Sequence, residues 1–490
     1  MATESLAPVA AITDLILGTL TIVLANRAVN HDPHKRFTAL LFGWTFIFIG
    51  AYYTIVSVIE LGYPDETFGW SLVQFGVFES TGVGVYDALV FMLFGLQSAI
   101  NILTLALALH LPFDLGSGRN WNSMMIGSIG VYCVVVPIIV IFGGFSITVF
   151  QSVMILATSV IWTMIYVRGL LSEMLEENDD ARSASKGAGL LLIAFYSPSM
   201  IWWLSTVMMG NNEWFSGVLS QFSESASVLY LLGVNTIWVA GLMPILVLLF
   251  GEGYRTFKKG TSLLSIVVFV VVVIGFINYF IDVALSDVLV SCYETECQDV
   301  PVAFTIWSGL TTDVLAFLFV PLLFVYVLIQ YRLVESSSDE NRNLLRIMIL
   351  LLILIVSSSF IELVQSLIPI PQMVTASLLA IAVAFFIGWE EKITGWFVQE
   401  SVDGETVTGD TLLPQSLSKF TVLMSVLLVY IISVSWLFAN MGVGLGVRTS
   451  REWIWICPPS PLFSTTGEAT SPWRLRWFSR WLCLFTPRWI

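Results

Sequence analysis

Apolar residues occur along this chain in long runs, which short polar stretches separate. A helix needs about 20 mostly apolar residues to cross the hydrocarbon core of a bilayer, and about twelve runs reach that length. We therefore predict an all-α, polytopic integral membrane bundle of about twelve transmembrane helices. The predicted spans are 6–27, 38–62, 85–112, 123–143, 146–168, 187–209, 226–250, 262–286, 303–330, 345–368, 371–389 and 420–446.

The overall composition agrees with this pattern and limits what else the chain can hold. Apolar residues make up 57% of the 490 residues and charged residues only 11%. The longest polar stretch between predicted spans, 390–419, contains 30 residues. That length is below the usual domain minimum of about 50 residues. These 490 residues therefore exclude an appended soluble catalytic domain such as a kinase or an ATPase.

The positions of Lys and Arg predict how the helices are oriented. All fifteen Lys and Arg residues before position 447 lie in or beside odd-numbered loops of the predicted topology. The even-numbered loops contain acidic residues but no Lys or Arg. Basic residues accumulate in loops that remain cytoplasmic. We therefore expect a cell-membrane protein whose N-terminus is outside and whose odd-numbered loops are cytoplasmic.

The composition changes at residue 447, which divides the chain into a transmembrane helical domain, 1–446, and a tail, 447–490. The tail contains six Arg and two Glu residues and no Lys or Asp, so its net charge is +4. It also contains six of the eighteen Trp residues. We expect a poorly ordered basic tail. A membrane-surface anchor and sequence without a selected structure are both compatible with this composition.

The residue inventory argues against several classes of membrane protein. The three histidines, His31, His34 and His110, lie in or beside predicted inner loops, which argues against paired haem ligands and histidine metal sites. All six Lys residues lie in loops, so a retinal Schiff base within the membrane is excluded. No zinc-protease or P-loop motif is present. We expect no cofactor, no metal site and no nucleic-acid partner, and a lipid bilayer as the surroundings.

Two cysteines lie close together in a predicted outer loop. Cys292 and Cys297 occur in the sequence Ser-Cys-Tyr-Glu-Thr-Glu-Cys. An outer loop permits disulfide formation, so a short cross-link is one interpretation. A weak cation site that uses Glu294 and Glu296 is another, and two free cysteines are a third.

Acidic residues within the predicted spans are the main candidates for a functional site. Asp14, Asp313 and Glu362 lie well inside the first, ninth and tenth spans, toward the predicted outer side. An ionisable group in hydrocarbon is expensive and usually faces the bundle interior. We predict that these three residues converge on a polar cavity and bind a small cation, a proton or a substrate. The alternative is that they lie in the hydrated outer interface.

A second set of polar residues carries a weaker signal. Asp87 and Asp282 lie near predicted helix ends. Four amides each share a helical face with another candidate: Asn278 with Asp282, Gln365 with Glu362, and Gln97 with Asn101. Such residues can line a polar path or form interhelical hydrogen bonds. The weaker candidates are Asp87, Asp282, Asn278, Gln365, Gln97 and Asn101.

Two function classes fit these observations best. Many crossings, little soluble mass, intramembrane carboxylates and prolines within spans favour a secondary transporter coupled to a cation or a proton. The alternative is a membrane-embedded ligand-sensing or scaffold module without a catalytic domain. An intramembrane enzyme has less support, since only unassigned carboxylates point to it.

Overall fold

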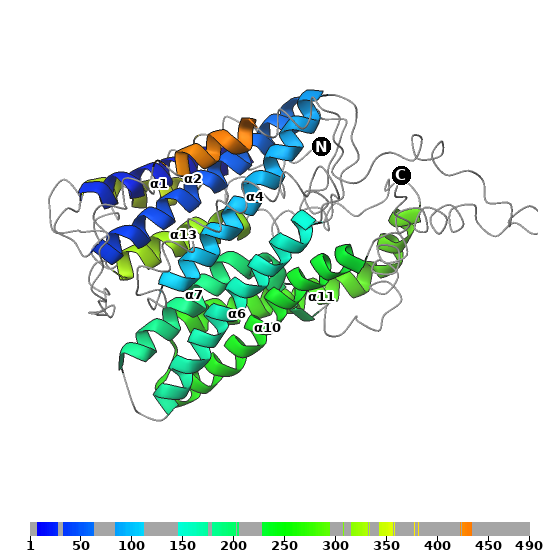
Figure 1. The fold of residues 1–490 in the computed structure, drawn as a ribbon. Helices are drawn as coiled ribbons and strands as arrows, with labels where there is room; N and C mark the ends of the chain where they lie inside the picture. The colour runs from blue at the N-terminus through cyan, green and yellow to red at the C-terminus, as the bar shows by residue number, and fades with distance from the viewer. Residues whose placement is uncertain are drawn as a thin grey trace, which may run out of the picture.

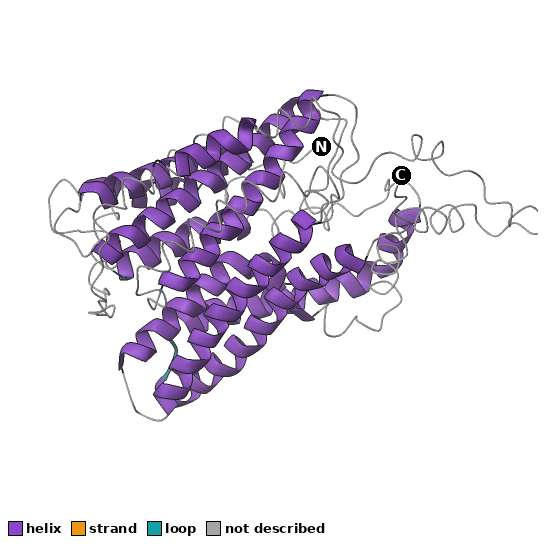
Figure 2. Ribbon diagram, in the orientation of Figure 1, coloured by secondary structure: helices purple, strands orange, loops and turns teal. Residues whose placement is uncertain are grey.

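The structure of this protein is a computed structural model, and every regular element among its described residues is an α-helix (Figure 2). The longer helices are α1 (Ala7–Arg27), α2 (Pro33–Gly62), α4 (Gly84–His110), α6 (Ser146–Met174), α7 (Asp179–Ile201), α10 (Val228–Lys259), α11 (Leu263–Glu294) and α13 (Leu315–Gln330). Two shorter apolar helices are Asn343–Ile355 and Met424–Ser433. The described residues are 7–27, 33–62, 84–111, 146–174, 179–201, 203–204, 228–294, 315–331, 343–355 and 424–433, and single residues at 307, 333, 357, 377, 381 and 422.

Several of these helices are suited to a membrane. Five are long and apolar enough to cross a bilayer: Ala7–Arg27, Lys35–Gly62, Gly84–His110, Val153–Met174 and Leu263–Ile281. Helices satisfy their own backbone hydrogen bonds, which makes them suitable for spanning hydrocarbon. The chain is therefore a multi-pass membrane protein. The expected total of about twelve crossings includes spans outside the described residues and stays a prediction.

Three helices continue beyond the apolar runs that predicted them. Helix α6 extends past residue 168 to Met174, α7 begins at Asp179 rather than at 187, and α10 continues past residue 250 to Lys259. At 1.5 Å per residue, these extensions add roughly 9–13 Å of helix. The hydropathy pattern did not reveal the extensions because charged and other polar residues interrupt the apolar runs there. Their polar side chains pair with one another across the helices, as described below.

Close packing joins α1 to α2 (Figure 1). An added Cβ at Gly18 would lie 2.7 Å from the carbonyl oxygen of Gly43. One at Gly50 would lie 2.8 Å from the backbone nitrogen of Leu15. Small residues allow membrane helices to approach closely, because association there depends on van der Waals packing. Glycine at these positions therefore sets the spacing of α1 and α2.

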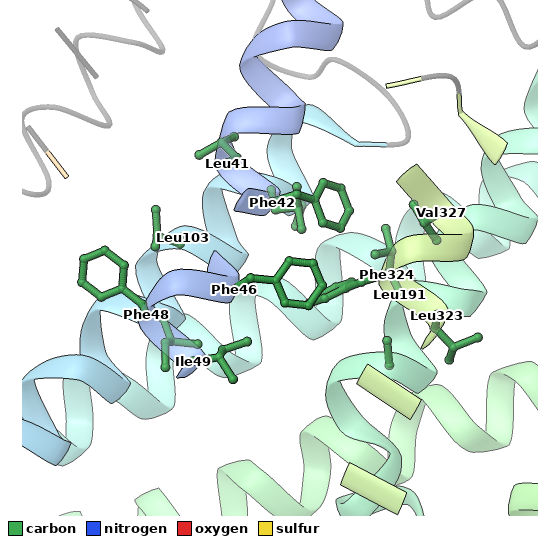
Figure 3. Close-up of a cluster of buried hydrophobic side chains, with 14 of the residues drawn as sticks. Leu41, Phe42, Phe46, Phe48, Ile49, Leu103, Leu191, Leu323, Phe324 and Val327 are labelled. Atoms are coloured by element: carbon green, nitrogen blue, oxygen red, sulfur yellow. The ribbon is translucent and has the colours of Figure 1, made fainter. Parts of the chain in front are cut away.

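Aromatic residues connect α2 to the helices around α13 (Figure 3). The ring of Phe324 in α13 meets Phe42 and Phe46 of α2 edge-on, at centroid distances of 5.1 and 4.9 Å. It also meets Phe195 of α7 at 4.6 Å. Edge-to-face pairs at such distances are favourable beyond the area that they bury. Phe324 therefore packs between α2 and α7.

Helix ends that adjoin basic residues gather at one end of the bundle. Phe37 at the start of α2 meets His110 at the end of α4, with ring centroids 5.1 Å apart. Gly187 of α7 packs beneath Tyr331, which follows α13. Trp162 of α6 donates to the carbonyl of Leu111, just after α4, at 3.0 Å. We call this the basic end, because Arg36, Lys186 and Arg255 lie near these helix termini.

Candidate functional site

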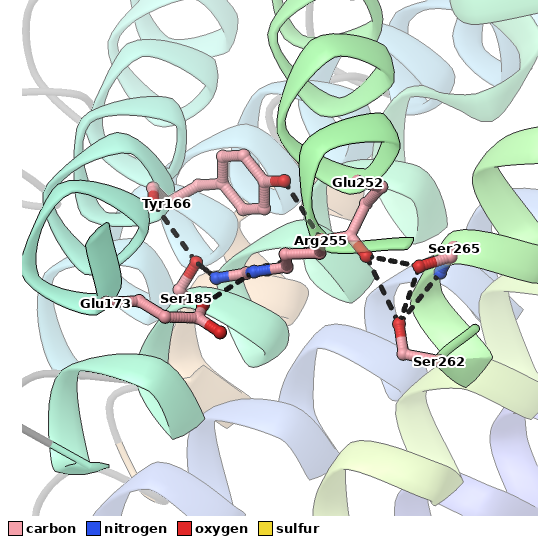
Figure 4. Close-up of polar contacts among 7 residues, drawn as sticks. All are labelled: Tyr166, Glu173, Ser185, Glu252, Arg255, Ser262 and Ser265. Atoms are coloured by element: carbon pink, nitrogen blue, oxygen red, sulfur yellow. Dashed lines mark hydrogen bonds and ion pairs between the residues drawn. The ribbon is translucent and has the colours of Figure 1, made fainter. Parts of the chain in front are cut away.

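A cluster of buried polar side chains joins four helices at the basic end (Figure 4). We call it the interhelical cluster. Its charged members are Glu173 from the end of α6 and Glu252 and Arg255 from the end of α10. The hydroxyl-bearing members are Tyr166, Ser185, Ser262 and Ser265.

Arg255 uses all three of its guanidinium nitrogens within the cluster. Its Nε donates to Glu173 Oε2 at 2.8 Å, Nη1 to Glu252 Oε1 at 2.6 Å and Nη2 to Ser185 Oγ at 2.8 Å. Its guanidinium carbon lies 5.2 Å from the centroid of the Tyr166 ring, a cation–π distance. The side chains of Arg255 and Glu173 are each only 5% exposed, so water screens this pair little.

Glu252 accepts four hydrogen bonds. Oε1 accepts from Tyr166 OH at 3.0 Å as well as from Arg255. Oε2 accepts from Ser262 Oγ at 3.1 Å and from Ser265 Oγ at 2.7 Å. Hydrogen bonds in which a partner is charged are shorter and stronger than neutral ones. The Glu252 side chain is therefore held in place by donors from α6, from α10 and from the start of α11.

The electrostatic balance keeps Arg255 charged. Burial alone lowers the pKa of its guanidinium, because desolvation disfavours the charged form. Tyr166, Glu252 and Glu173 oppose this effect, and the pKa of Arg255 is on balance raised above its ordinary value. The cluster thus contains a permanent cation between two carboxylates.

Local sequence explains how α10 and α11 present these groups. Glu252 and Arg255 are three residues apart and share a face of α10. Gly260 follows the end of α10 with φ of 91°, a left-handed conformation that favours glycine. Ser262 then caps α11, because its Oγ accepts from the backbone nitrogen of Ser265 at 3.1 Å. The short connection therefore directs both serine hydroxyls to Glu252.

Asp14 is the deeply placed candidate that the structure describes. Its side chain lies on α1 and the residue is only 3% exposed. Oδ1 has no hydrogen-bond partner among the described residues. The neighbouring positions on this face, Ala10, Ala11 and Gly18, offer no side-chain donor. An ionised carboxylate without donors in such surroundings is costly.

The weaker candidates that the structure describes differ in their hydrogen-bond partners. Asn278 of α11 is buried, and its Oδ1 accepts from the Trp307 indole at 3.1 Å. Gln97 Nε2 donates to Asn101 Oδ1 within α4 at 3.3 Å. Asn101 is also buried, and its Nδ2 has no acceptor among the residues that the structure describes. Asp87 is buried in the first turn of α4.

The remaining predicted site residues cannot be placed in relation to Asp14. Asp282 and Cys292 belong to α11, but the structure does not describe their side chains. Four predicted residues lie outside the described residues: Asp313, Glu362, Gln365 and Cys297. The convergence of three acids and the disulfide therefore stay predictions. The proposed tail, 447–490, also lies outside the described residues.

Sequence reasoning missed the interhelical cluster. Arg255 entered the topology prediction only as one of the basic residues, and Glu252 was not singled out. The available signal was a carboxylate three residues before an arginine at the end of a span, in a loop otherwise rich in Lys. That spacing predicts a shared helix face, but it does not identify the partners on other helices.

Comparisons with protein-family models, with curated proteins and with solved structures each found no match to this chain.

Proposed function

We propose that this multi-pass membrane protein is a secondary transporter coupled to a proton or a small cation. Asp14 is the proposed coupling residue. The observation that carries the proposal is a carboxylate that is buried in a membrane-spanning helix, with an oxygen that lacks a partner among the described residues. Binding and release of a cation by such a group can be linked to movement of helices around it.

We further propose that the basic end faces the cytoplasm. Arg36, Lys186 and Arg255 lie at helix termini that share this end, and short cytoplasmic loops accumulate such residues. Asp14 is in the second turn of α1, far from the end of that helix that adjoins Arg27. The coupling residue therefore lies toward the proposed outer side, as expected for a group that binds its proton or cation from outside.

Ion flux in reconstituted vesicles tests the transport proposal. The full chain is placed in sealed liposomes that contain a pH-sensitive dye or a sodium-sensitive dye. Pools of amino acids, organic acids and sugars are then supplied outside the vesicles. Wild-type protein is expected to give substrate-dependent proton or sodium entry, and Asp14→Asn is expected to abolish it. Glu60→Gln, a change at a partly buried carboxylate near the end of α2, is the matched control and is expected to retain entry.

The outcome separates the transporter from the second candidate, a ligand-sensing module. Absence of ion movement from the wild-type protein for every pool would refute the transporter. A pool that raises the thermal stability of the protein without ion movement would instead favour the sensor, because a ligand that binds the folded state stabilises it. Unchanged ion entry in Asp14→Asn would remove Asp14 from the coupling mechanism.

A further inference from the structure

Two pairs of consecutive helices meet at the basic end, and the interhelical cluster connects them. Glu173 ends α6 and Ser185 lies near the start of α7. Glu252 and Arg255 lie near the end of α10, and the serines that bond Glu252 lie at the start of α11. Arg255 and Glu252 therefore tie together the ends of all four helices (Figure 4).

Separate contacts join the same helices further along their length. Ser159 of α6 donates to the carbonyl of Ala240 of α10 at 2.8 Å. Tyr196 of α7 donates to the carbonyl of Ile155 of α6 at 2.8 Å. An added Cβ at Gly241 would lie 2.5 Å from the Cβ of Ser199, so α10 and α7 nearly touch there. These contacts provide a fixed region about which the helix ends can separate.

The chemistry of the cluster suits a connection that opens and closes. When closed, each charged member has partners inside the protein, as the distances above show. When the helix ends part, water at the membrane surface can replace those partners, so neither state leaves an ion without partners. An apolar seal would instead expose hydrocarbon to water on opening. Internal ion pairs also contribute little net stability compared with apolar packing, which leaves switching as a reason to keep them.

We propose that the interhelical cluster is a latch that closes the basic end of the bundle, and that its separation opens a path between the α6–α7 pair and the α10–α11 pair. The proposal rests on the proposed transport function, because alternating access requires each end of the bundle to open in turn. Arg255 is the central element, since its loss removes the contacts to both carboxylates and to Ser185.

Chemical accessibility of a buried reporter tests the latch without a transported substrate. The reporter is Ala184→Cys, which adjoins Ser185 and replaces a buried side chain. It is placed in the full chain after the five native cysteines are changed to alanine. The rate of its reaction with a charged maleimide is measured in liposomes. With Arg255→Gln present, we expect the rate to rise at least about tenfold, because local opening becomes more frequent.

Two controls distinguish latch opening from general destabilisation. The first is a reference reporter, Thr38→Cys, at a fully buried position near the start of α2 at the same end of the bundle. Its rate is expected to stay within about twofold, because local opening leaves other regions protected. The second is Arg36→Gln, which removes a guanidinium at this end whose Nε donates to the Ala25 carbonyl at 3.1 Å. It is expected to leave the Ala184→Cys rate unchanged.

A milder variant keeps the test decisive if Arg255→Gln does not fold. Glu173→Gln removes the ion pair between α6 and α10 and leaves Arg255 paired with Glu252. A selective rise at Ala184→Cys in either variant supports the latch. Equal increases in labelling rate at both reporters would show that the cluster only stabilises the fold. No increase at either reporter would show that the cluster does not close this end. Both results overturn the proposal.

This readout also separates the latch from the transport proposal. Labelling requires no substrate or ion gradient, so the latch can fail while ion-coupled uptake remains. A selective rise in labelling in a protein that moves no ions would instead retain the latch and refute transport.

Discussion

Replacement of Arg255 by methionine removes the cation that lies between two buried carboxylates. The guanidinium donates to Glu173 at 2.8 Å and to Glu252 at 2.6 Å, and those two side chains are 5% and 2% exposed. Loss of one partner from a buried ion pair leaves an uncompensated charge and costs about 3–5 kcal/mol. We expect Arg255→Met to lower the free energy of unfolding by about that amount, since both remaining carboxylates repel each other.

The same three positions provide a test of the cause. If Glu173→Gln and Glu252→Gln are added to Arg255→Met, no buried charge remains. Replacement of a complete buried ion network by neutral groups is often neutral or stabilising. We therefore expect the triple variant to lie within about 1 kcal/mol of the wild-type protein, so that it recovers most of the stability lost in the single variant.

Reversible unfolding by sodium dodecyl sulfate in mixed micelles, followed by tryptophan fluorescence, gives the required free energies. Arg36→Met is the control, because among the described residues this arginine donates to a neutral group, the backbone carbonyl of Ala25. Its loss is expected to cost about 1 kcal/mol. The reasoning would be refuted if Arg255→Met cost no more than the control, which would mean that water solvates the cluster. A triple variant as unstable as the single variant would show that charge burial is not the cause.

Three further predictions follow from the packing and from the orientation. Gly251→Ala should destabilise by about 1–3 kcal/mol because its Cβ meets the tyrosine of the interhelical cluster. Gly253→Ala, with nothing within 4 Å of the added Cβ, should instead stabilise by about 0.5–1 kcal/mol in the same assay. Gly18→Ala should lower the free energy of unfolding by about 1–3 kcal/mol. Gly62→Ala, at a helix end with open space around the added Cβ, should lower it much less. Equal losses of stability would contradict close α1–α2 packing. Lys35→Cys should react with a charged maleimide from the cytoplasmic side only, and reaction from outside would reverse the proposed orientation.

The apolar runs predicted the helices well where the membrane alone determines them. The predicted span 6–27 is close to α1 at Ala7–Arg27, and 85–112 is close to α4 at Gly84–His110. A segment in hydrocarbon must satisfy its own backbone, so a sufficiently long apolar run has few alternatives to a helix. Hydropathy cannot predict where a helix ends at the membrane surface, because polar residues are favourable there in both helices and loops. The extensions of α6, α7 and α10 therefore could not be predicted.

Of the two candidate sites, the sequence identified one and missed the other. The sequence identifies Asp14 as unusual because a carboxylate inside an apolar run is costly wherever the helix packs. The interhelical cluster has no such local signal, since its charges lie beside spans, where charge is common. Glu173 and Arg255 are 82 residues apart, and only the packing of α6 against α10 brings them together. Partners on different helices are a property of the tertiary fold, which one sequence does not reveal.

A series of packed residues links the two sites that we consider functional. Close packing joins α1, which holds Asp14, to α2, and α2 contacts Phe324 of α13 through Phe42. Phe324 in turn meets Phe195 of α7, the helix that places Ser185 in the cluster. If this series transmits ion binding to the latch, occupancy of Asp14 should change the labelling rate of a reporter near the start of α7. Phe324→Leu keeps the position apolar but removes three ring contacts, so it should weaken that response, at a stability cost of about 2–4 kcal/mol. The measurement is the ratio of labelling rates with and without an imposed proton or sodium gradient. An unchanged ratio in Phe324→Leu would show that spatial proximity along this series does not carry the coupling.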